Sequence, residues 1–503
     1  MTQMKKFIIP SMIVAAMAFT SCNDYLDINS NPNSPTESSL SNDLIYPAVE
    51  IAYASNIGDN LRTVSAYLVE YYAQYIGTSN YVDISNFIVP ATRTAGVYTQ
   101  MNLRVISNAN IVMGKAEAEG DWATYLAATV MMCQAYQTLI DCYGETPYTE
   151  ALDSSNAMPH YDEGQVVYSG ILEQLDEAIS KASADLNQAT ATSFLIPNGT
   201  AADWIKVANA LKLKILMREH NVVNVSSQLS SLISQNNFPT SDVEWAGCWS
   251  NASGKANPFY SEDFADWGSQ KNTILNCALA VTMQAYGDAR IPAYFSPAPA
   301  DGQWRGSISG TNLSTAADPY KSVSYWCRPN MAYNTPVSFM SLAEINFFLA
   351  EYYAESGDIS RGASYYEAAI NASFASAGVS GAAAAIAAYP FDSANWKRSL
   401  GIQKWVHLSA VNTFEGWCEV RRLKYPTFDT SVTASDMFDD TTINSPVDTS
   451  ILSPGYLYTP LKVNSDVGNN TLVQRFYYSS SSTNTNSNAP ELKSLTTPIF
   501  WAQ

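Results

Sequence analysis

Basic residues and histidines are scarce in this chain of 503 residues. It has 27 lysines and arginines against 46 aspartates and glutamates, which gives a formal net charge of −19. A nucleic-acid interface needs clustered positive charge, so this balance argues against nucleic acid as a partner. The three histidines, His160, His220 and His407, are widely separated along the chain. We therefore expect no zinc site and no cofactor; the sequence does not place the clustered oxygen ligands that calcium needs.

The sequence also lacks the motifs of common enzyme classes. It has no G-x-S-x-G elbow, no glycine-rich phosphate loop and no H-E-x-x-H motif. A glycoside hydrolase needs only two carboxylates, and candidates such as Glu344 and Glu351 fall on expected helices, where acids more often have structural roles. We predict a protein that is not an enzyme, with a surface glycoside hydrolase as an alternative.

A single apolar run is present, at residues 7–18, and it follows Lys5 and Lys6. It is too short to span a bilayer as a helix, which takes about 20 residues. A basic head, a short apolar run and small residues before a cleavage site are typical of a secretory signal peptide. Cys22 directly after them resembles the lipobox of bacterial lipoproteins. We predict that residues 1–21 are removed and that Cys22 carries the lipid; the alternative is an ordinary secreted protein.

Residues 22–43 are rich in asparagine, serine, proline and threonine, which is the composition of a linker. Fully extended, this tether would reach on the order of 70 Å. We expect one folded domain over residues 44–503. Within it, residues 236–337 and 427–503 are irregular and rich in glycine, proline, asparagine, serine and aromatic residues.

Apolar residues elsewhere recur at helical spacing, and the runs come in pairs separated by short breaks. Such hairpins bury their faces by stacking, as tetratricopeptide repeats do. The sequence therefore predicts an all-α fold of tetratricopeptide-like hairpins supporting a loop-rich ligand face, with a plain helical bundle as the alternative. The expected helical segments are 61–76, 97–118, 122–142, 163–182, 201–220, 272–286, the pair 340–377 broken at Gly357 and Asp358, 396–408 and 412–423.

Aromatic residues gather in the irregular segments, beside asparagine, aspartate and arginine. Flat rings can contact the C–H faces of sugars while polar neighbours bond their hydroxyls, so this mixture favours glycan binding. Core packing is the alternative for each single ring. The predicted ligand residues are Trp249, Trp267, Trp304, Trp326 and Tyr81.

Other segments suggest structural roles. The helix expected to end near Asp141 is followed by Gly144 and Pro147, which mark a turn. Asn209 lies among apolar positions, where a buried amide would bind loop backbone. The charges from Glu415 to Arg422 alternate and can pair within or between helices. Six cysteines besides Cys22 allow fifteen pairings, and their spacing selects none.

Several of these segments together resemble the SusD/RagB family of nutrient-binding outer-membrane lipoproteins. The resemblance begins with the C-x-D-x-L-D-I-N pattern at Cys22 and spans almost the whole mature chain. It rests mainly on segments 22–36, 141–151, 204–218, 288–290, 403–405, 414–426 and 500–501.

The resemblance implies an all-helical body with four tetratricopeptide-like hairpins. It further implies a lid on a SusC-type TonB-dependent outer-membrane transporter that captures oligosaccharides and delivers them for import. Asp24 and Asp27 resemble the signal that places such lipoproteins on the outer face of the cell outer membrane. The alternatives are a peptide-binding member of the same family and a scaffold that binds only protein.

Overall fold

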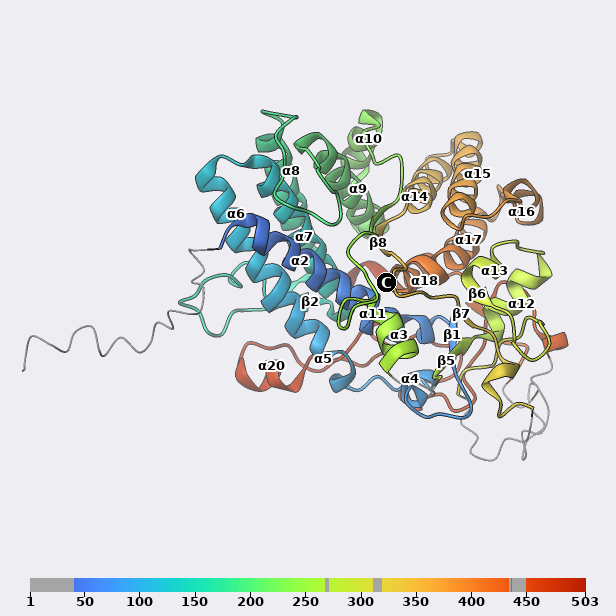
Figure 1. The fold of residues 1–503 in the computed structure, drawn as a ribbon. Coiled ribbons are helices and arrows are strands. Elements are labelled where there is room, and N and C mark those ends of the chain that lie inside the picture. The colour runs from blue at the N-terminus through green and yellow to red at the C-terminus, as the bar shows by residue number, and fades with distance from the viewer. Residues whose placement is uncertain (1–39, 267–270, 311–318, 434–435, 437–448) are drawn as a thin grey trace, which may run out of the picture.

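The computed structural model describes residues 40–266, 271–310, 319–433, 436 and 449–503 (Figure 1). The predicted signal peptide, Cys22 and most of the predicted tether lie outside these residues, as does Trp267. The first described helix, α2, begins at Asn42.

Four helical hairpins form the frame of the described chain, and in each the two helices pack against one another. Figure 1 shows α6, α8, α9, α14 and α15 following one another along the upper side of the molecule. This arrangement confirms the predicted all-α fold of tetratricopeptide-like hairpins. The bounds are α6 Ser107–Glu119 with α7 Trp122–Tyr143, α8 Gly164–Ala182 with α9 Ala201–Glu219, α14 Leu342–Glu355 with α15 Ile359–Ser376, and α17 Trp396–Val411 with α18 Thr413–Leu423.

The other helices are shorter or lie at the edges of these hairpins. The π-helical segment η2 (Met101–Ile106) joins α5 to α6 without a break. The remaining bounds are α2 Asn42–Gly58, α3 Asn60–Leu68, α4 Val82–Ser85, α5 Ala91–Gln100, α10 Ser226–Gln235, α11 Pro258–Tyr260, η3 Ser261–Asp266, α12 Cys277–Ala285, α13 Ile291–Tyr294, η4 Val323–Tyr325, α16 Ala382–Ala388, η5 Thr449–Ile451, α20 Ser480–Thr485 and η6 Phe500–Ala502.

Strands occur in the described residues only as short two-stranded pairs. Four pairs are antiparallel, and the pair of β9 with β10 is parallel. The pairs are β1 Tyr72–Gln74 with β5 Thr273–Leu275, β2 Glu145–Thr146 with β3 Asp162–Glu163, β4 Val243–Trp245 with β8 Val337–Met340, β6 Phe295–Ser296 with β7 Arg328–Pro329, and β9 Thr427–Phe428 with β10 Tyr456–Leu457.

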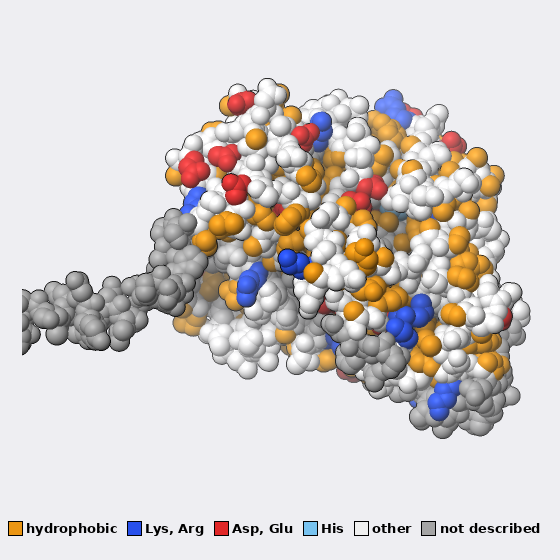
Figure 2. All heavy atoms as spheres, in the orientation of Figure 1, with side chains coloured by type: hydrophobic (Ala, Val, Ile, Leu, Met, Phe, Trp, Pro, Cys, Tyr) orange, Lys and Arg blue, Asp and Glu red, His pale blue; other side chains and the backbone are white. Residues whose placement is uncertain are grey.

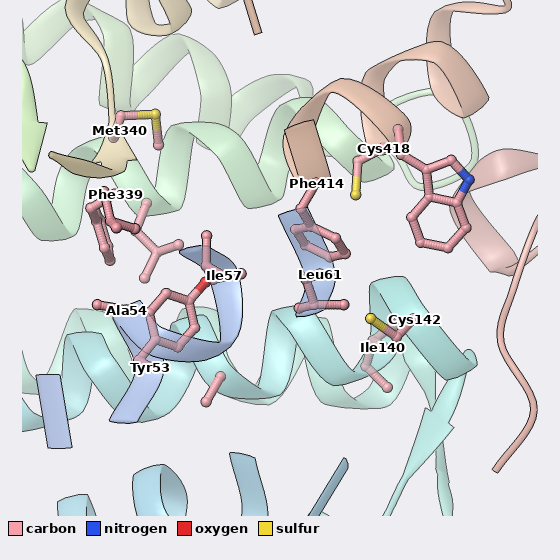
Figure 3. Packing of buried hydrophobic residues seen from close by; sticks show 14 of the residues in the cluster. Tyr53, Ala54, Ile57, Leu61, Ile140, Cys142, Phe339, Met340, Phe414 and Cys418 are labelled. Carbon is pink, nitrogen blue, oxygen red and sulfur yellow. The ribbon is translucent and has the colours of Figure 1, made fainter. Parts of the chain in front are cut away.

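The main core lies where the hairpins meet α2, α3 and β8. Figure 3 shows Tyr53 and Ile57 from α2 facing Phe339 and Met340 of β8. Helix α7 crosses this core, and 20 of its 22 residues are buried, so it has no solvent face of its own. Its end agrees with the sequence, because Gly144 adopts a φ of +89° there, a conformation that favours glycine.

A network of paired charges joins the hairpins. On α9, Arg218 is fully buried and pairs with Asp141 of α7 and with Glu415 of α18. Lys214, one turn before Arg218, lies 2.9 Å from the other oxygen of Glu415. Burial alone would raise the pKa of Glu415, but Arg218 and Lys214 hold it at about 2.

The same network continues into the second half of the chain. Arg422 of α18 makes two bonds of 2.6 Å to Glu351 of α14 and two, of 2.7 and 3.1 Å, to Glu419. Lys404 of α17 lies 2.6 Å from Glu419. The Trp501 indole donates to Asp141 at 2.8 Å. The alternating charges and terminal tryptophan seen in the sequence therefore serve the helical frame.

Two expected helices are partly wrong. Helix α3 ends at Leu68, and the following residues turn through Glu70, at φ +58°, into strand β1. Residues 273–275, expected to begin a helix, form the partner strand β5. The buried Glu70 carboxylate accepts a hydrogen bond from the Tyr458 amide at 2.8 Å, which holds this turn. Backbone pairing between segments 200 residues apart leaves no periodic signal in either one.

Two further features bear on the sequence predictions. Asn209 is buried and donates to the Asn237 carbonyl at 3.0 Å, so its predicted role in holding loop backbone is confirmed. The six cysteines in the described residues are free thiols, and only Cys248 is partly exposed. Over the same residues, no helix has the length and apolar character needed to span a membrane.

Candidate functional site

The ligand residues predicted from the sequence lie at different depths. Trp249, Trp326 and Tyr81 are buried, at 8%, 3% and 4% exposure. The Trp249 indole donates to the Trp245 carbonyl at 2.7 Å, within the main core. Trp304 is partly exposed and packs against that core, and Trp267 is outside the described residues. The structure does not gather the four described rings into one cluster.

A different set of rings does come together, and we call Tyr75, Tyr320, Tyr325 and Trp326 the aromatic cluster. They pack over Ala73, Ile76 and Ile274, which form a small hydrophobic cluster separate from the main core. Tyr325 lies edge-on to both Tyr320 and Trp326, with ring centroids 5.1 Å apart in each pair. The three tyrosines are partly exposed, so the cluster has a buried tryptophan base and a tyrosine surface.

Backbone pairing holds the cluster in place. Strand β1 precedes Tyr75, and β5 pairs with it antiparallel, Ala73 opposite Ile274. The Tyr75 hydroxyl donates to the Lys321 carbonyl, and the Trp326 indole donates to the Tyr320 carbonyl at 2.9 Å. Both side chains are thus bonded to a loop rather than to a helix, and the rings keep fixed positions although the segment is irregular.

Charged groups lie beside the rings. The Arg305 guanidinium is 4.1 Å from the centroid of the Tyr325 ring, donates to the Tyr325 carbonyl at 3.0 Å, and pairs with Asp301. The loop that carries Arg305 runs against the aromatic cluster, since the Cys327 amide donates to the Arg305 carbonyl. Trp304 is the residue before Arg305, so its partly exposed ring belongs to the same loop.

A second group of rings lies near β5, where Arg328 donates to the Thr273 carbonyl at 3.3 Å. Tyr260 and Phe264 stack with their planes at 7°, and Arg328 lies 4.1 Å from the Phe264 centroid. Arg328 pairs with the buried Asp263 at 2.7 Å. Burial raises the pKa of Asp263 to about 6, although Arg328 acts against that rise. Tyr81 joins this group by donating to Glu262 at 3.2 Å.

The aromatic cluster combines two kinds of contact that a sugar ring requires. Exposed tyrosine faces offer apolar contact with little entropy to lose, and Arg305 and Asp301 offer a donor and an acceptor for hydroxyl groups. The ligand residues predicted from the sequence are mostly tryptophans and do not include Tyr75, Tyr320 or Tyr325. The sequence shows the size of each ring, but it does not show which rings are exposed in the folded protein.

The two acids considered for catalysis have structural roles. Glu344 forms a capping box with Ser341 at the start of α14, and Glu351 is bound by Arg422 and Lys404. Both carboxylates therefore stabilise the helical hairpins. Among the residues with described positions, no three histidine, cysteine or acidic side chains form a group able to hold a metal ion.

These features define a class of protein: stacked helical hairpins that support an irregular face with aromatic residues. A family model described as "Starch-binding associating with outer membrane", of the SusD-like type, matches residues 31–446. The chain therefore belongs to the SusD-like family, as its motifs indicated. No match was found among curated protein sequences.

Solved structures share this fold at low sequence identity. A SusD homologue from Bacteroides uniformis is 18% identical with a TM-score of 0.72, covering 92% of this chain and 99% of the homologue. A SusD-like protein from Bacteroides thetaiotaomicron is 18% identical with a TM-score of 0.69, covering 90% and 98%. A chitin-binding SusD homologue from Flavobacterium johnsoniae is 17% identical with a TM-score of 0.68, covering 92% and 96%.

Proposed function

We propose that this protein captures oligosaccharides on the aromatic cluster and passes them to a SusC-type TonB-dependent transporter, without catalysis. The observation that carries the proposal is the set of partly exposed tyrosines fixed over Trp326 with Arg305 beside them. The family description, starch binding and association with the outer membrane, supports it. The fold shared with a chitin-binding homologue is consistent with a glycan ligand.

Calorimetric titration with starch and chitin oligosaccharides tests the proposed site. Replacing Tyr320 and Tyr325 together by alanine should weaken glycan binding on the order of tenfold or more, because contact area at the centre of the site is lost. Trp304→Ala should weaken it less, since that ring packs against the main core and is not a member of the aromatic cluster. The predicted role of Trp267 is tested in the same assay by Trp267→Ala.

A matched control exists on the helical side of the molecule. Tyr353 and Tyr365 also stack, 5.4 Å apart, with Arg361 lying 4.4 Å from the Tyr353 centroid. Replacing these two tyrosines by alanine removes the same side chains from a regular helical surface. Equal loss of affinity in both double variants, or none in either, would reject the aromatic cluster as the site.

The same preparations separate the alternatives. Binding of short peptides in place of glycans would favour a peptide-binding member of the family. Release of reducing sugars on incubation with polysaccharides would favour a glycoside hydrolase.

The proposed lipid anchor is tested by Cys22→Ala, which should move the protein from the membrane fraction to the soluble fraction. Co-purification of the intact protein with a large outer-membrane barrel protein tests the transporter partner.

A further inference from the structure

A cavity of about 240 Å³ lies where the loop-rich part meets the hairpins. Its wall combines α3, β1, β4 and β8 with the ends of α15 and α17. It is distinct from the aromatic cluster and shares no residue with it. The wall brings together residues from position 62 to position 411, so the cavity exists only in the folded chain.

One wall of the cavity holds a buried arginine. Arg62 is 7% exposed, and its Nη2 donates to the Tyr72 hydroxyl at 3.1 Å and to the Ala410 carbonyl at 2.9 Å. Its Nε has no hydrogen-bond partner. Among the residues that the structure describes, no carboxylate pairs with it. A buried guanidinium without a counter-charge is costly, and an anion entering the cavity would reduce that cost.

The opposite charge is present in the same cavity. Asp242 and Glu244 line it, and neither forms an ion pair within the described part of the chain. Asp242 accepts from the Leu342 amide at 2.8 Å, which fixes its position. On β4, Glu244 faces the cavity while Val243 and Trp245 are buried in the core. Burial, with Asp242 nearby, raises the pKa of Glu244, so a cation beside these acids would be favourable.

The cavity therefore offers an unpaired cation and two unpaired acids that do not satisfy one another. A ligand meeting both needs an anionic and a cationic group on one small frame. The volume of about 240 Å³ suits a small solute. Met331, Tyr294 and Pro336 supply an apolar wall for the rest of the ligand.

We propose that this cavity binds a small zwitterion of the free α-amino acid class, its carboxylate on Arg62 and its ammonium group on Asp242 and Glu244. The glycan site is separate, so the protein would recognise two chemically different small solutes. Binding here stands independently of oligosaccharide capture on the aromatic cluster.

Calorimetric titration of the whole mature protein tests the proposal with glycine, L-alanine and L-serine. Acetate and methylammonium serve as probes that carry only one of the two charges. We expect the amino acids to bind at least about tenfold more tightly than either singly charged probe. Equal binding of acetate would reduce the site to an anion site, and the absence of any amino-acid binding would overturn the proposal.

Two variants sharpen the test. Glu244→Gln removes one acid whose side chain makes no hydrogen bond within the described residues, so we expect the fold to persist. It should weaken L-alanine binding on the order of 30-fold, whereas Glu173→Gln, at an exposed acid of α8, should leave it unchanged. Unchanged binding in Glu244→Gln would overturn the proposal.

Arg62→Met should abolish the binding of L-alanine. If that variant fails to fold because the bonds to Tyr72 and Ala410 are lost, the probe series and Glu244→Gln still decide the question. Glycan titration of Glu244→Gln should match that of the unaltered protein. A failure of the proposed glycan function would then be visible separately from a failure of this proposal.

Discussion

The helical hairpins and the loop-rich face use the same side chains in opposite ways. Where the hairpins meet, Arg218 and Arg422 are buried and paired with buried carboxylates. On the loop-rich face, Arg305 lies against a partly exposed tyrosine and pairs with the exposed Asp301. Figure 2 shows lysine and arginine side chains on one face as separate spots, without a broad basic patch.

This difference suggests that the hairpins give the molecule its rigidity and that the loop-rich face contacts the ligand. A buried ionic network fixes the positions of helices, because breaking any pair leaves a charge in a low-dielectric interior. The loop-rich face takes its positions from backbone pairing such as β1 with β5, and the tyrosines of the aromatic cluster stay partly exposed. We therefore expect substitutions in the hairpins to affect stability and substitutions in the loops to affect binding.

The largest effect is expected from breaking the ionic network. Arg218→Met would leave Asp141 and Glu415 buried without their shared partner. We expect the free energy of unfolding to fall by about 3–5 kcal/mol, measured by urea denaturation. Glycan affinity of the remaining folded protein should not change. A loss of stability below about 1 kcal/mol would show that the network does not hold the hairpins together.

The next effect concerns Glu70, at the junction of the two regions. Burial raises the pKa of its carboxyl group from 4.5 to about 8. The folded state then keeps a proton that the unfolded chain releases near pH 4.5, so stability from this group is present at low pH and is lost as the pH rises toward 8. Glu50 and Glu344, each with a pKa raised to about 7, act in the same direction.

Glu70→Gln removes the titration and keeps an acceptor for the Tyr458 amide. We expect the loss of unfolding free energy between pH 5 and pH 8 to shrink on the order of 3 kcal/mol in this variant. Urea denaturation of both proteins at the two pH values measures it. An identical pH dependence in the variant would mean that Glu70 is ionised in the folded protein throughout this range.

The hairpins were predictable because their signals are local. Apolar residues at helical spacing gave α7, α8 and α9 nearly to the residue, and the alternating charges of α18 indicated pairing. What the sequence did not contain was the partner of each charge. Asp141 and Glu415 are 274 positions apart, yet both bind Arg218, and no spacing rule connects them.

The loop-rich face was less predictable. Its aromatic composition indicated a binding face, but not which rings would stay exposed. Trp249 and Trp326 are buried, whereas Tyr320 and Tyr325, from the same irregular segments, are partly exposed. How deeply each aromatic side chain of this face is buried depends on three-residue strands such as β1 and β5, and the pairing of these strands depends on the whole fold.

A smaller effect that sharpens the comparison is expected at Gly306, beside Arg305. A Cβ atom there would lie 2.4 Å from the backbone of Asn276, too close to be accommodated without movement. Gly306→Ala should cost about 1–3 kcal/mol of stability and shift Arg305 away from Tyr325, so glycan affinity should fall as well. Gly247→Ala, in open space, is the control. Unaltered glycan affinity in Gly306→Ala would show that the position of Arg305 does not matter for binding.

The smallest expected change in unfolding free energy comes from replacing Lys212, and Lys214 on the same helix provides the comparison. Lys212 and Lys214 both belong to α9, but Lys212 pairs with the mostly exposed Asp176, while Lys214 pairs with the buried Glu415. Lys212→Met should change the free energy of unfolding by less than about 1 kcal/mol, and added salt should reduce even that. Lys214→Met should cost several times more and respond little to salt, because its pair is out of reach of solvent ions. Equal effects of the two substitutions would mean that burial does not set the strength of these ion pairs. The electrostatic difference between the helical hairpins and the loop-rich face would then not hold.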